Sequence, residues 1–178
     1  MADARAKSPS WLDAAWQTVF RLGFPLARAY WHLRRPRHEG ALVAIHVGEA
    51  VLLVRLSYRK SWHFPGGSVR RGESPALAAR RELMEELGLT LTAPLVSAGS
   101  ASGIWDGRRD RVHFFELRLD RLPAFRIDNR EIVAARLMTP HELAQVSTTG
   151  PVAAYLARAR SPPRRASARP NEPVEAGR

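Results

Sequence analysis

Residues 67–89, GSVRRGESPALAARRELMEELGL, combine helix start and stop signals with a dense group of acids. Ser74 suits an N-cap, Pro75 suits the first helical position, and Gly88 suits the residue that closes a helix. The helix predicted between them carries glutamates at positions 82, 85 and 86. At about 100° per residue, these side chains fall within a roughly 100° arc. The stretch therefore predicts a helix with three carboxylates crowded on one face.

This crowded face has two interpretations. Glutamate favours helices, so the run ELMEE can be a solvated charged surface. Carboxylates at these spacings also repel one another unless a cation lies between them, and a hard divalent cation prefers oxygen ligands. The sequence FPGG at 64–67 favours a ligand site, because its two glycines allow the backbone to approach a ligand closely.

The spacing of the fixed residues resembles the Nudix box, G-x5-E-x7-R-E-U-x-E-E-x-G-U, where U is aliphatic. Every fixed position matches, and the matching residues are Gly67, Glu73, Arg81, Glu82, Leu83, Glu85, Glu86, Gly88 and Leu89. The resemblance to the Nudix hydrolase family covers roughly residues 40–157. It implies an α/β fold, the Nudix-type α/β/α sandwich with a mixed sheet.

The predicted order of elements is compatible with that fold. Two β-branched runs, 41–47 and 50–56, flank a two-residue turn with Gly48 and predict a hairpin. Further strands are expected at 95–100, 111–120 and 131–138, with a loop at 101–110, a helix start at 139–142 and a final helix at 151–160. We predict an N-terminal extension at 1–39, the Nudix domain at 40–158 and a disordered Pro/Arg-rich tail at 159–178.

The resemblance implies a metal-dependent pyrophosphohydrolase, in which water attacks a phosphorus of a nucleoside diphosphate linked to another group. Cations must neutralise the charge of two adjacent phosphates, and Mg²⁺ or Mn²⁺ would do so. The expected metal ligands are Glu82, Glu85 and Glu86. A backbone carbonyl near Gly66 is an additional candidate.

The other candidate site residues have alternatives that stay open. Arg81 is expected to pair with Glu73 and brace the loop against the helix, and a pair with Glu85 is the alternative. The general base is a box glutamate or Glu131, which could equally be a surface acid. Candidate substrate contacts, with solvated charge and core packing as the alternatives, are Arg55, Arg59 and Lys60 for phosphate and Trp62 and Trp105 for a base.

Composition limits the compartment and the partners. The chain contains no cysteine, which excludes disulfides and thiolate metal sites. No apolar run reaches 18 residues, and Asp13 interrupts the N-terminal apolar stretch, so neither a transmembrane helix nor a signal peptide is predicted. We expect a cytoplasmic protein that acts on a nucleotide-type small molecule.

The formal net charge of +11 is concentrated at the two ends. Residues 1–39 carry seven Lys/Arg and three acids, and residues 158–178 carry six Lys/Arg and two acids. Basic ends can bind nucleic acid or anionic lipid, or can be solvated arms. We favour solvated arms and predict no specific nucleic-acid partner.

An amphipathic helix is predicted from Trp11 to the residue before Pro36, with a kink at Pro25. Its apolar half consists of Trp11, Leu12, Ala15, Trp16, Val19, Phe20, Leu22, Gly23, Leu26, Ala29, Tyr30 and Leu33. Asp13, Gln17 and Arg21 occupy the other half. We expect the apolar half to pack on the domain or on a second copy in a homodimer. The alternative is an interfacial helix that binds an anionic membrane surface.

Two further functions compete with hydrolysis. One is a catalytically silent Nudix-fold module that senses a nucleotide. The other is a membrane- or nucleic-acid-associated binding module. Loss of a box glutamate would indicate the silent module, and no glutamate is lost.

Overall fold

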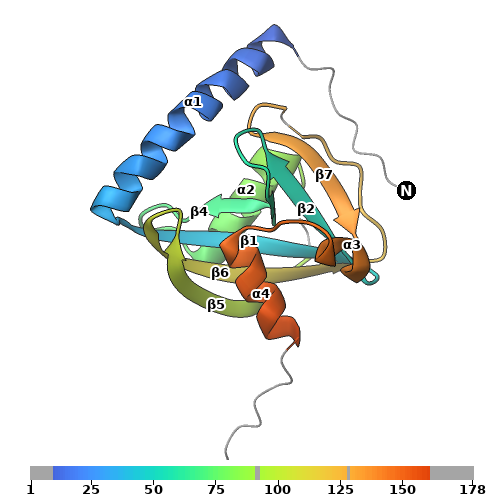
Figure 1. The fold of residues 1–178 in the computed structure, drawn as a ribbon. Coiled ribbons are helices and arrows are strands. Elements are labelled where there is room, and N and C mark those ends of the chain that lie inside the picture. Colours follow the sequence, from blue (N-terminus) through green and yellow to red (C-terminus); the bar gives the residue numbers. More distant parts are fainter. Residues whose placement is uncertain (1–9, 91–92, 128, 161–178) are drawn as a thin grey trace, which may run out of the picture.

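The structure is a computed structural model that describes residues 10–90, 93–127 and 129–160. The elements in chain order are α1 (Trp11–Arg34), β1 (Arg37–Val47), β2 (Ala50–Leu56), β3 (Trp62–His63), β4 (Gly66–Ser68), α2 (Pro75–Leu87), β5 (Val96–Trp105), β6 (Arg108–Leu119), β7 (Ile132–Met138), α3 (Pro140–Ala144) and α4 (Gly150–Arg160). Figure 1 shows their arrangement. The segments expected to be disordered, at the N-terminus and beyond residue 160, lie outside the described residues.

The strands form one mixed sheet of seven strands. The main order is β3-β2-β1-β6-β5, while β4 pairs with β1 and β7 pairs with β2. β1 and β6 run parallel in register from Arg37↔Arg109 to Val47↔Leu119, and the other pairs are antiparallel. The predicted α/β class with a mixed sheet is confirmed.

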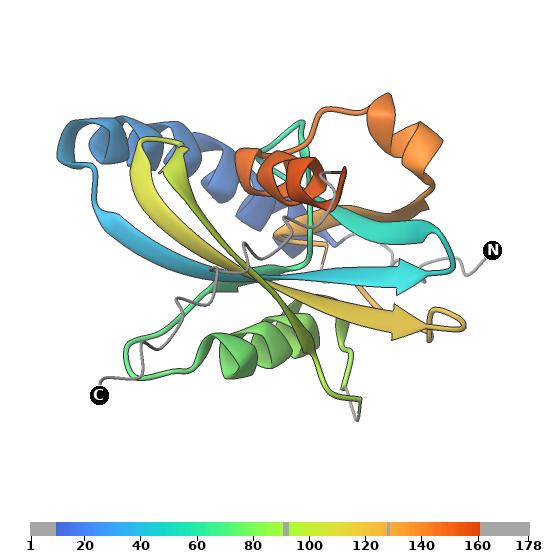
Figure 2. The same cartoon turned by 90° about the horizontal axis from the view of Figure 1, so that it is seen from below.

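Two hydrophobic cores lie on opposite faces of the sheet. β1 supplies alternate residues to both, because successive side chains of a strand point to opposite faces. Leu83 and Leu87 of α2 are buried in one core, and Val152 and Tyr155 of α4 are buried in the other. Figure 2 shows α2 on one side of the sheet and α4 on the other. The α/β/α sandwich is therefore confirmed as well.

The caps of α2 agree with the sequence signals. The Ser74 hydroxyl accepts a hydrogen bond from the backbone N–H of Leu77, and Pro75 occupies the first helical position. Gly88 adopts a φ of 63° and donates its N–H to the carbonyl of Met84. Local capping chemistry thus sets both ends of the helix that carries the box glutamates.

The loop predicted at 101–110 is wrong. β5 continues to Trp105 and β6 begins at Arg108, so Asp106 and Gly107 alone form the turn. Both have positive φ, 51° and 83°. Asp-Gly favours such a two-residue hairpin turn, and this pattern identifies the hairpin in retrospect.

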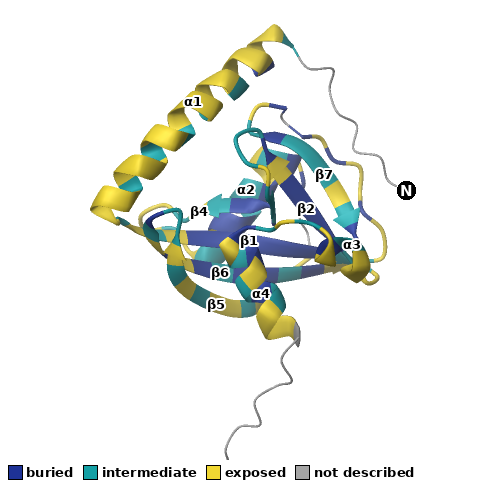
Figure 3. Cartoon of the chain, viewed as in Figure 1, coloured by how far each residue is buried: buried dark blue, intermediate teal, exposed yellow. Residues whose placement is uncertain are grey.

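α1 lies along the edge of the domain with its orientation reversed from our expectation. Its inner face, toward the domain, consists of Asp13, Gln17, Phe20, Phe24 and Trp31. The outer face consists of Trp11, Leu12, Trp16, Val19, Leu22, Leu26, Tyr30 and Leu33, each at least 46% exposed. The exposed residues are visible along α1 in Figure 3. The expectation that the apolar half packs on the domain is wrong, except for Phe20, whose ring contacts that of Tyr58.

Polar contacts explain this orientation. Asp13 is buried and pairs with Arg130 at 3.3 Å, and the Gln17 side-chain amide donates to the carbonyl of Asn129 at 2.8 Å. Long-range partners of this kind are invisible in the periodicity of the helix itself. Among the described helices, none has the length and apolar character needed to cross a membrane.

Candidate active site

The close approach of α2 to β4 defines the first part of the site. A Cβ atom on Gly67 would lie 2.6 Å from the carboxyl carbon of Glu82, so only glycine leaves room for this carboxylate. The backbone N–H of Gly66 donates to Glu86 Oε2 at 2.8 Å. The FPGG segment therefore allows two box glutamates to lie directly against the backbone.

Arg81 connects the glutamates to the loop before α2. Its Nε and Nη2 donate to the two carboxylate oxygens of Glu73 at 2.9 and 3.0 Å, and Nη2 also donates to the carbonyl of Ser68. Its Nη1 donates to Glu82 at 2.7 Å and to Glu85 at 3.2 Å. Both contacts considered for Arg81, the brace to Glu73 and the pair with Glu85, are thus present together.

These hydrogen bonds change the acid–base properties of the pair. Hydrogen bonds from Arg81 and from the backbone N–H of Arg70 lower the pKa of Glu73 to about 2. The same contact with Glu73 raises the pKa of Arg81 above its ordinary value. Both groups are therefore charged at neutral pH, and the brace is an ion pair.

The donor set on α2 suits a hard divalent cation. Glu82, Glu85 and Glu86 offer oxygen ligands only, and Mg²⁺ and Mn²⁺ prefer oxygen. In the described parts of the chain, no three His, Asp or Glu side chains converge closely enough to hold a metal ion as they stand. Two of the three carboxylates contact Arg81 instead, which supplies the positive charge that the cluster needs.

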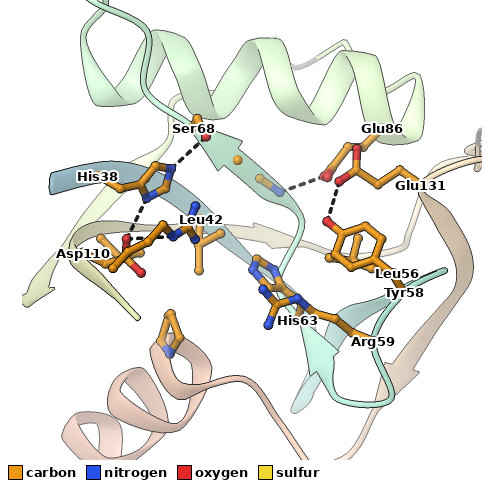
Figure 4. A pocket seen from close by; sticks show the side chains of 16 residues that line it. His38, Leu42, Leu56, Tyr58, Arg59, His63, Ser68, Glu86, Asp110 and Glu131 are labelled. Carbon is orange, nitrogen blue, oxygen red and sulfur yellow. Dashed lines mark hydrogen bonds and ion pairs between the residues drawn. The ribbon is translucent and has the colours of Figure 1, made fainter. Parts of the chain in front are cut away.

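A pocket of about 170 Å³ opens beside Gly66 and Gly67 (Figure 4). Its polar lining residues are His38, Tyr58, Arg59, His63, Ser68, Glu86, Arg108, Asp110 and Glu131. Glu86, Glu131 and Tyr58 lie on one side of it, and His38, Ser68 and Asp110 lie on the other. The pocket thus joins part of the box to residues far away in the sequence.

Glu131 shares this pocket with Glu86, as a candidate general base would require. The hydroxyl of Tyr58 donates to Glu131 Oε1 at 2.8 Å. Burial, together with the charge of Glu131, raises the pKa of Tyr58 above its ordinary value. Tyr58 therefore stays protonated and holds the Glu131 carboxylate by one hydrogen bond.

A hydrogen-bonded chain of three residues forms the opposite side. His38 Nδ1 lies 2.9 Å from Asp110 Oδ1, and His38 Nε2 lies 2.8 Å from Ser68 Oγ. His38 pairs with Asp110 in the β1–β6 register, and Asp110 is only 4% exposed. None of these three residues was among the predicted site residues, because polar residues near strand ends resemble solvated surface.

His63 is a neutral member of the lining. Desolvation lowers its pKa to about 4. The hydrogen bond between Nδ1 and the carbonyl of Phe64 acts in the opposite direction but is the smaller effect. The imidazole is therefore uncharged at neutral pH. His63, too, was not among the predicted site residues.

Only one of the five predicted substrate contacts lines the pocket. Arg59 does so, and its Nη2 lies 2.7 Å from Asp106 Oδ2. The guanidinium of Arg55 lies over the Trp62 ring at 5.5 Å, and Lys60 is exposed in the turn after β2. Trp62 and Trp105 pack against the core on the α4 side, as in the alternative considered for them.

The fold and the site thus combine a mixed sheet between helices with a carboxylate-bearing helix that packs against a glycine pair. The family model described as "NUDIX domain" matches residues 36–159, which are more than half of the chain. The chain therefore belongs to the NUDIX family. The described part of the chain is thus a Nudix hydrolase domain preceded by α1.

Known proteins resemble this chain in sequence and in structure. A U8 snoRNA-decapping enzyme from Homalodisca vitripennis is 28% identical over 100 residues, which are 55% of this chain and 54% of that protein. The chain thus spans about half the length of this relative. The MutT protein of Methanosarcina mazei superposes with a TM-score of 0.61 at 18% identity, covering 70% of this chain and 93% of that one.

A second similar structure carries a nucleotide and a metal. It is a bifunctional NMN adenylyltransferase/ADP ribose pyrophosphatase of Francisella tularensis, complexed with AMP and a manganese ion. Its TM-score is 0.60 at 16% identity, covering 79% of this chain and 46% of that one. At 18% and 16% identity, these two structures support the assignment of the fold alone.

Proposed function

We propose that this protein is a metal-dependent hydrolase that cleaves a phosphoanhydride bond of a nucleoside diphosphate linked to another group. The observation that carries the proposal is the packing of Glu82 and Glu86 of a complete Nudix box against Gly66 and Gly67, beside a pocket that also contains Glu131. Cleavage of a diphosphate needs carboxylates for a cation and a base for water, and this arrangement supplies both.

The proposed roles follow from these positions. Glu82, Glu85 and Glu86, with the carbonyl of Gly66, would hold Mg²⁺ or Mn²⁺. The cation would supply charge neutralisation for the diphosphate and a lower pKa for water. Glu131 accepts the proton of the attacking water, and Tyr58 fixes its carboxylate through the 2.8 Å hydrogen bond.

Arg59 is the proposed contact for a substrate phosphate. It lines the pocket, and a guanidinium remains charged at any physiological pH. Arg81 is a positioning residue, because its contacts to Glu73 and Ser68 connect the helix to the β4 loop. Its removal should disturb the glutamates without removing a substrate contact.

A panel of substrates tests the reaction. Nucleoside diphosphate sugars such as ADP-ribose, nucleoside triphosphates and capped RNA are incubated with the full chain and Mg²⁺, and released products are separated by chromatography. The relative named as a decapping enzyme and the neighbour named as an ADP ribose pyrophosphatase motivate two of these classes. We expect turnover of at least one class that EDTA removes and Glu85→Gln lowers by about a hundredfold or more.

The panel also tests the silent module. Tight binding of a nucleotide by the wild-type protein, without turnover of any class at any Mg²⁺ or Mn²⁺ concentration, would favour a sensor over an enzyme. Turnover that Glu85→Gln and Glu86→Gln both retain would contradict the proposed metal site.

A second proposal concerns location: a cytoplasmic protein that binds peripherally to an anionic membrane through the outer face of α1. The supporting observation is the row of eight exposed apolar side chains along a helix of 24 residues, about 36 Å long. Patches of this kind generally mark an interaction surface.

Charge favours a lipid surface over a second copy. The sole acid of α1, Asp13, is turned inward to Arg130, whereas Arg21, Arg28 and Arg34 are exposed. Aromatic residues with flanking arginines suit the headgroup region of anionic bilayers. Two copies, each with a formal charge of +11, would repel one another.

Vesicle sedimentation distinguishes the two possible partners of the outer face of α1, an anionic membrane and a second copy of the chain. Full-length protein should bind phosphatidylserine vesicles, bind less at high salt, and ignore phosphatidylcholine vesicles. Leu22→Gln with Leu26→Gln should abolish binding without lowering the melting temperature. A stable dimer in gel filtration that the double variant dissociates, without vesicle binding by the wild type, would assign the face to a homodimer.

A further inference from the structure

The helix α1 precedes the NUDIX match at residues 36–159, yet its inner face contacts the wall of the pocket. Three lining residues, Tyr58, Arg59 and Arg108, each lie against an aromatic ring of α1. Figure 1 shows α1 running beside the domain along this edge. Tyr58 contacts Phe20 and Phe24, Arg59 contacts Phe24, and Arg108 contacts Trp31. Each aromatic ring of α1 can therefore affect a different residue of the pocket.

The ring of Tyr58 contacts two rings of α1. Its ring centroid is 5.9 Å from that of Phe20 and 4.7 Å from that of Phe24. Its hydroxyl donates to Glu131 at 2.8 Å. Tyr58 is partly buried, and its contacts with the two phenylalanine rings restrict the position of the hydroxyl that hydrogen-bonds Glu131.

α1 also holds the backbone around Glu131. The Arg21 side chain donates to the carbonyl of Ser57 at 3.2 Å, and the Ser57 N–H donates to the carbonyl of Glu131 at 2.7 Å. On the other side, Gln17 contacts the carbonyl of Asn129 at 2.8 Å. The loop after β2, whose Ser57 bonds the Glu131 backbone, and the loop before β7, which contains Asn129, are therefore both connected to α1.

The two arginines are stacked on the same helix. The guanidinium carbon of Arg59 lies 4.5 Å from the Phe24 ring centroid, and that of Arg108 lies 4.4 Å from the Trp31 ring centroid. Asp106 holds Arg59 at 2.7 Å and is reached by Arg28 of α1 at 3.7 Å. Stacking on a ring restricts a guanidinium to one plane.

We infer that α1 is part of the active site, with Phe20 a positioning residue for turnover and Trp31 a positioning residue for substrate affinity. This inference rests on the proposed function. Phe20 acts through Tyr58 on Glu131, the proposed general base that accepts the proton of the attacking water. Trp31 acts through Arg108, whose place in the pocket wall suits an anionic group of the substrate. Phe24 contacts both Tyr58 and Arg59 and serves both tasks.

The two tasks have different kinetic signatures. A residue that acts only in the chemical step changes kcat, and a residue that supports binding in ground and transition states changes KM. Phe20→Ala and Tyr58→Phe should lower kcat about tenfold with KM within about twofold. Trp31→Ala should raise KM about tenfold with kcat within about twofold. Conservative Phe20→Tyr and Trp31→Phe should retain most of each parameter.

Thr18→Ala is the matched control in the same helix. Thr18 is exposed, and within the described residues its hydroxyl donates only to the helix carbonyl of Ala14, at 2.9 Å. All variants are made in the full chain and assayed on the substrate found in the panel, with melting temperatures in parallel. Where Phe20→Ala melts at the assay temperature, Phe20→Leu replaces it, because leucine keeps more of the apolar volume than alanine and still removes the ring.

The outcomes separate this inference from the proposed function. If the wild-type chain turns over no substrate class of the panel, the proposed function itself is wrong, and if Glu85→Gln and Glu86→Gln both retain wild-type turnover, the proposed metal site is wrong. If Glu85→Gln abolishes turnover but Phe20→Ala, Tyr58→Phe and Trp31→Ala all behave as Thr18→Ala does, α1 lies outside the active site and the inference alone is overturned. Equal loss of kcat for all α1 variants, in proportion to the fraction unfolded, would also overturn it.

Discussion

The guanidinium of Arg81 contacts both carboxylate oxygens of Glu73, at 2.9 and 3.0 Å, across eight residues of sequence. The same guanidinium donates to the carbonyl of Ser68 at 2.9 Å. One side chain therefore connects the glutamate helix, the loop before it and the short strand β4. Because it also contacts Glu82, a change at Arg81 should affect stability and catalysis together.

Arg81→Ala should lower both the melting temperature and the turnover. The substitution removes the guanidinium that contacts both carboxylate oxygens of Glu73. The Glu73 charge is then uncompensated and lies beside other carboxylates, which is unfavourable. Arg81→Lys should recover only part of either property, because an ammonium cannot make the two parallel contacts. Differential scanning fluorimetry and a turnover assay measure the two. Loss of activity with an unchanged melting temperature would indicate that Arg81 contacts substrate instead.

Glu73→Gln should change how stability depends on acid. The folded-state pKa is about 2, below the ordinary 4.5, so the unfolded chain takes up the proton first as the pH falls. The contribution of the pair is fully present above pH 4.5 and is lost between about pH 4.5 and 2. Urea unfolding at several pH values should therefore show a smaller loss in this window for the variant. Parallel curves for both proteins would contradict the assignment.

His63→Asn should remove a second, separate pH effect. The pKa of His63 is lowered from 6.5 to about 4 by desolvation, so between these values the unfolded state binds a proton that the folded state does not. Stability is therefore expected to fall as the pH drops from 6.5 to about 4. Urea titrations in that range should show a shallower decline for His63→Asn. Glu73→Gln serves as the control that keeps this decline.

Glu86→Gln should abolish turnover while keeping the fold. The substitution preserves shape and keeps an oxygen that can accept from the Gly66 N–H, but it removes the charge that a divalent cation needs. We expect turnover lower by about a hundredfold or more, with weaker Mn²⁺ binding by isothermal titration and a melting temperature close to wild type. Full Mn²⁺ affinity in the variant would remove Glu86 from the proposed ligands.

Gly67→Ala should displace Glu82 and inactivate the enzyme. The added Cβ would lie 2.6 Å from the Glu82 carboxyl carbon, closer than such atoms approach one another. Gly23→Ala is the control, since a Cβ there meets nothing within 4 Å and alanine favours the helix interior by about 0.5–1 kcal/mol. Turnover and thermal stability of the two variants are compared. Wild-type turnover in Gly67→Ala would show that Glu82 can move without consequence.

Local sequence determined the helix α2 and the box it carries. Ser74, Pro75 and Gly88 act on neighbouring backbone groups, so their effects can be predicted without knowledge of the rest of the chain. The same holds for the Gly48 turn between β1 and β2, where a residue of positive φ joins two β-branched runs. The family pattern added the expected glutamate roles, and the structure brings Glu86 and Glu131 into one pocket.

Tertiary structure alone decided the orientation of α1 and the composition of the pocket. A helical period identifies which residues share a face but not which face meets the domain, because that depends on partners far away in the sequence. Here Asp13 meets Arg130, 117 residues away, and leaves the apolar stripe outside. Tyr58 likewise meets Glu131 only because β2 pairs with β7, and this strand pairing, not any local pattern, makes the two residues neighbours.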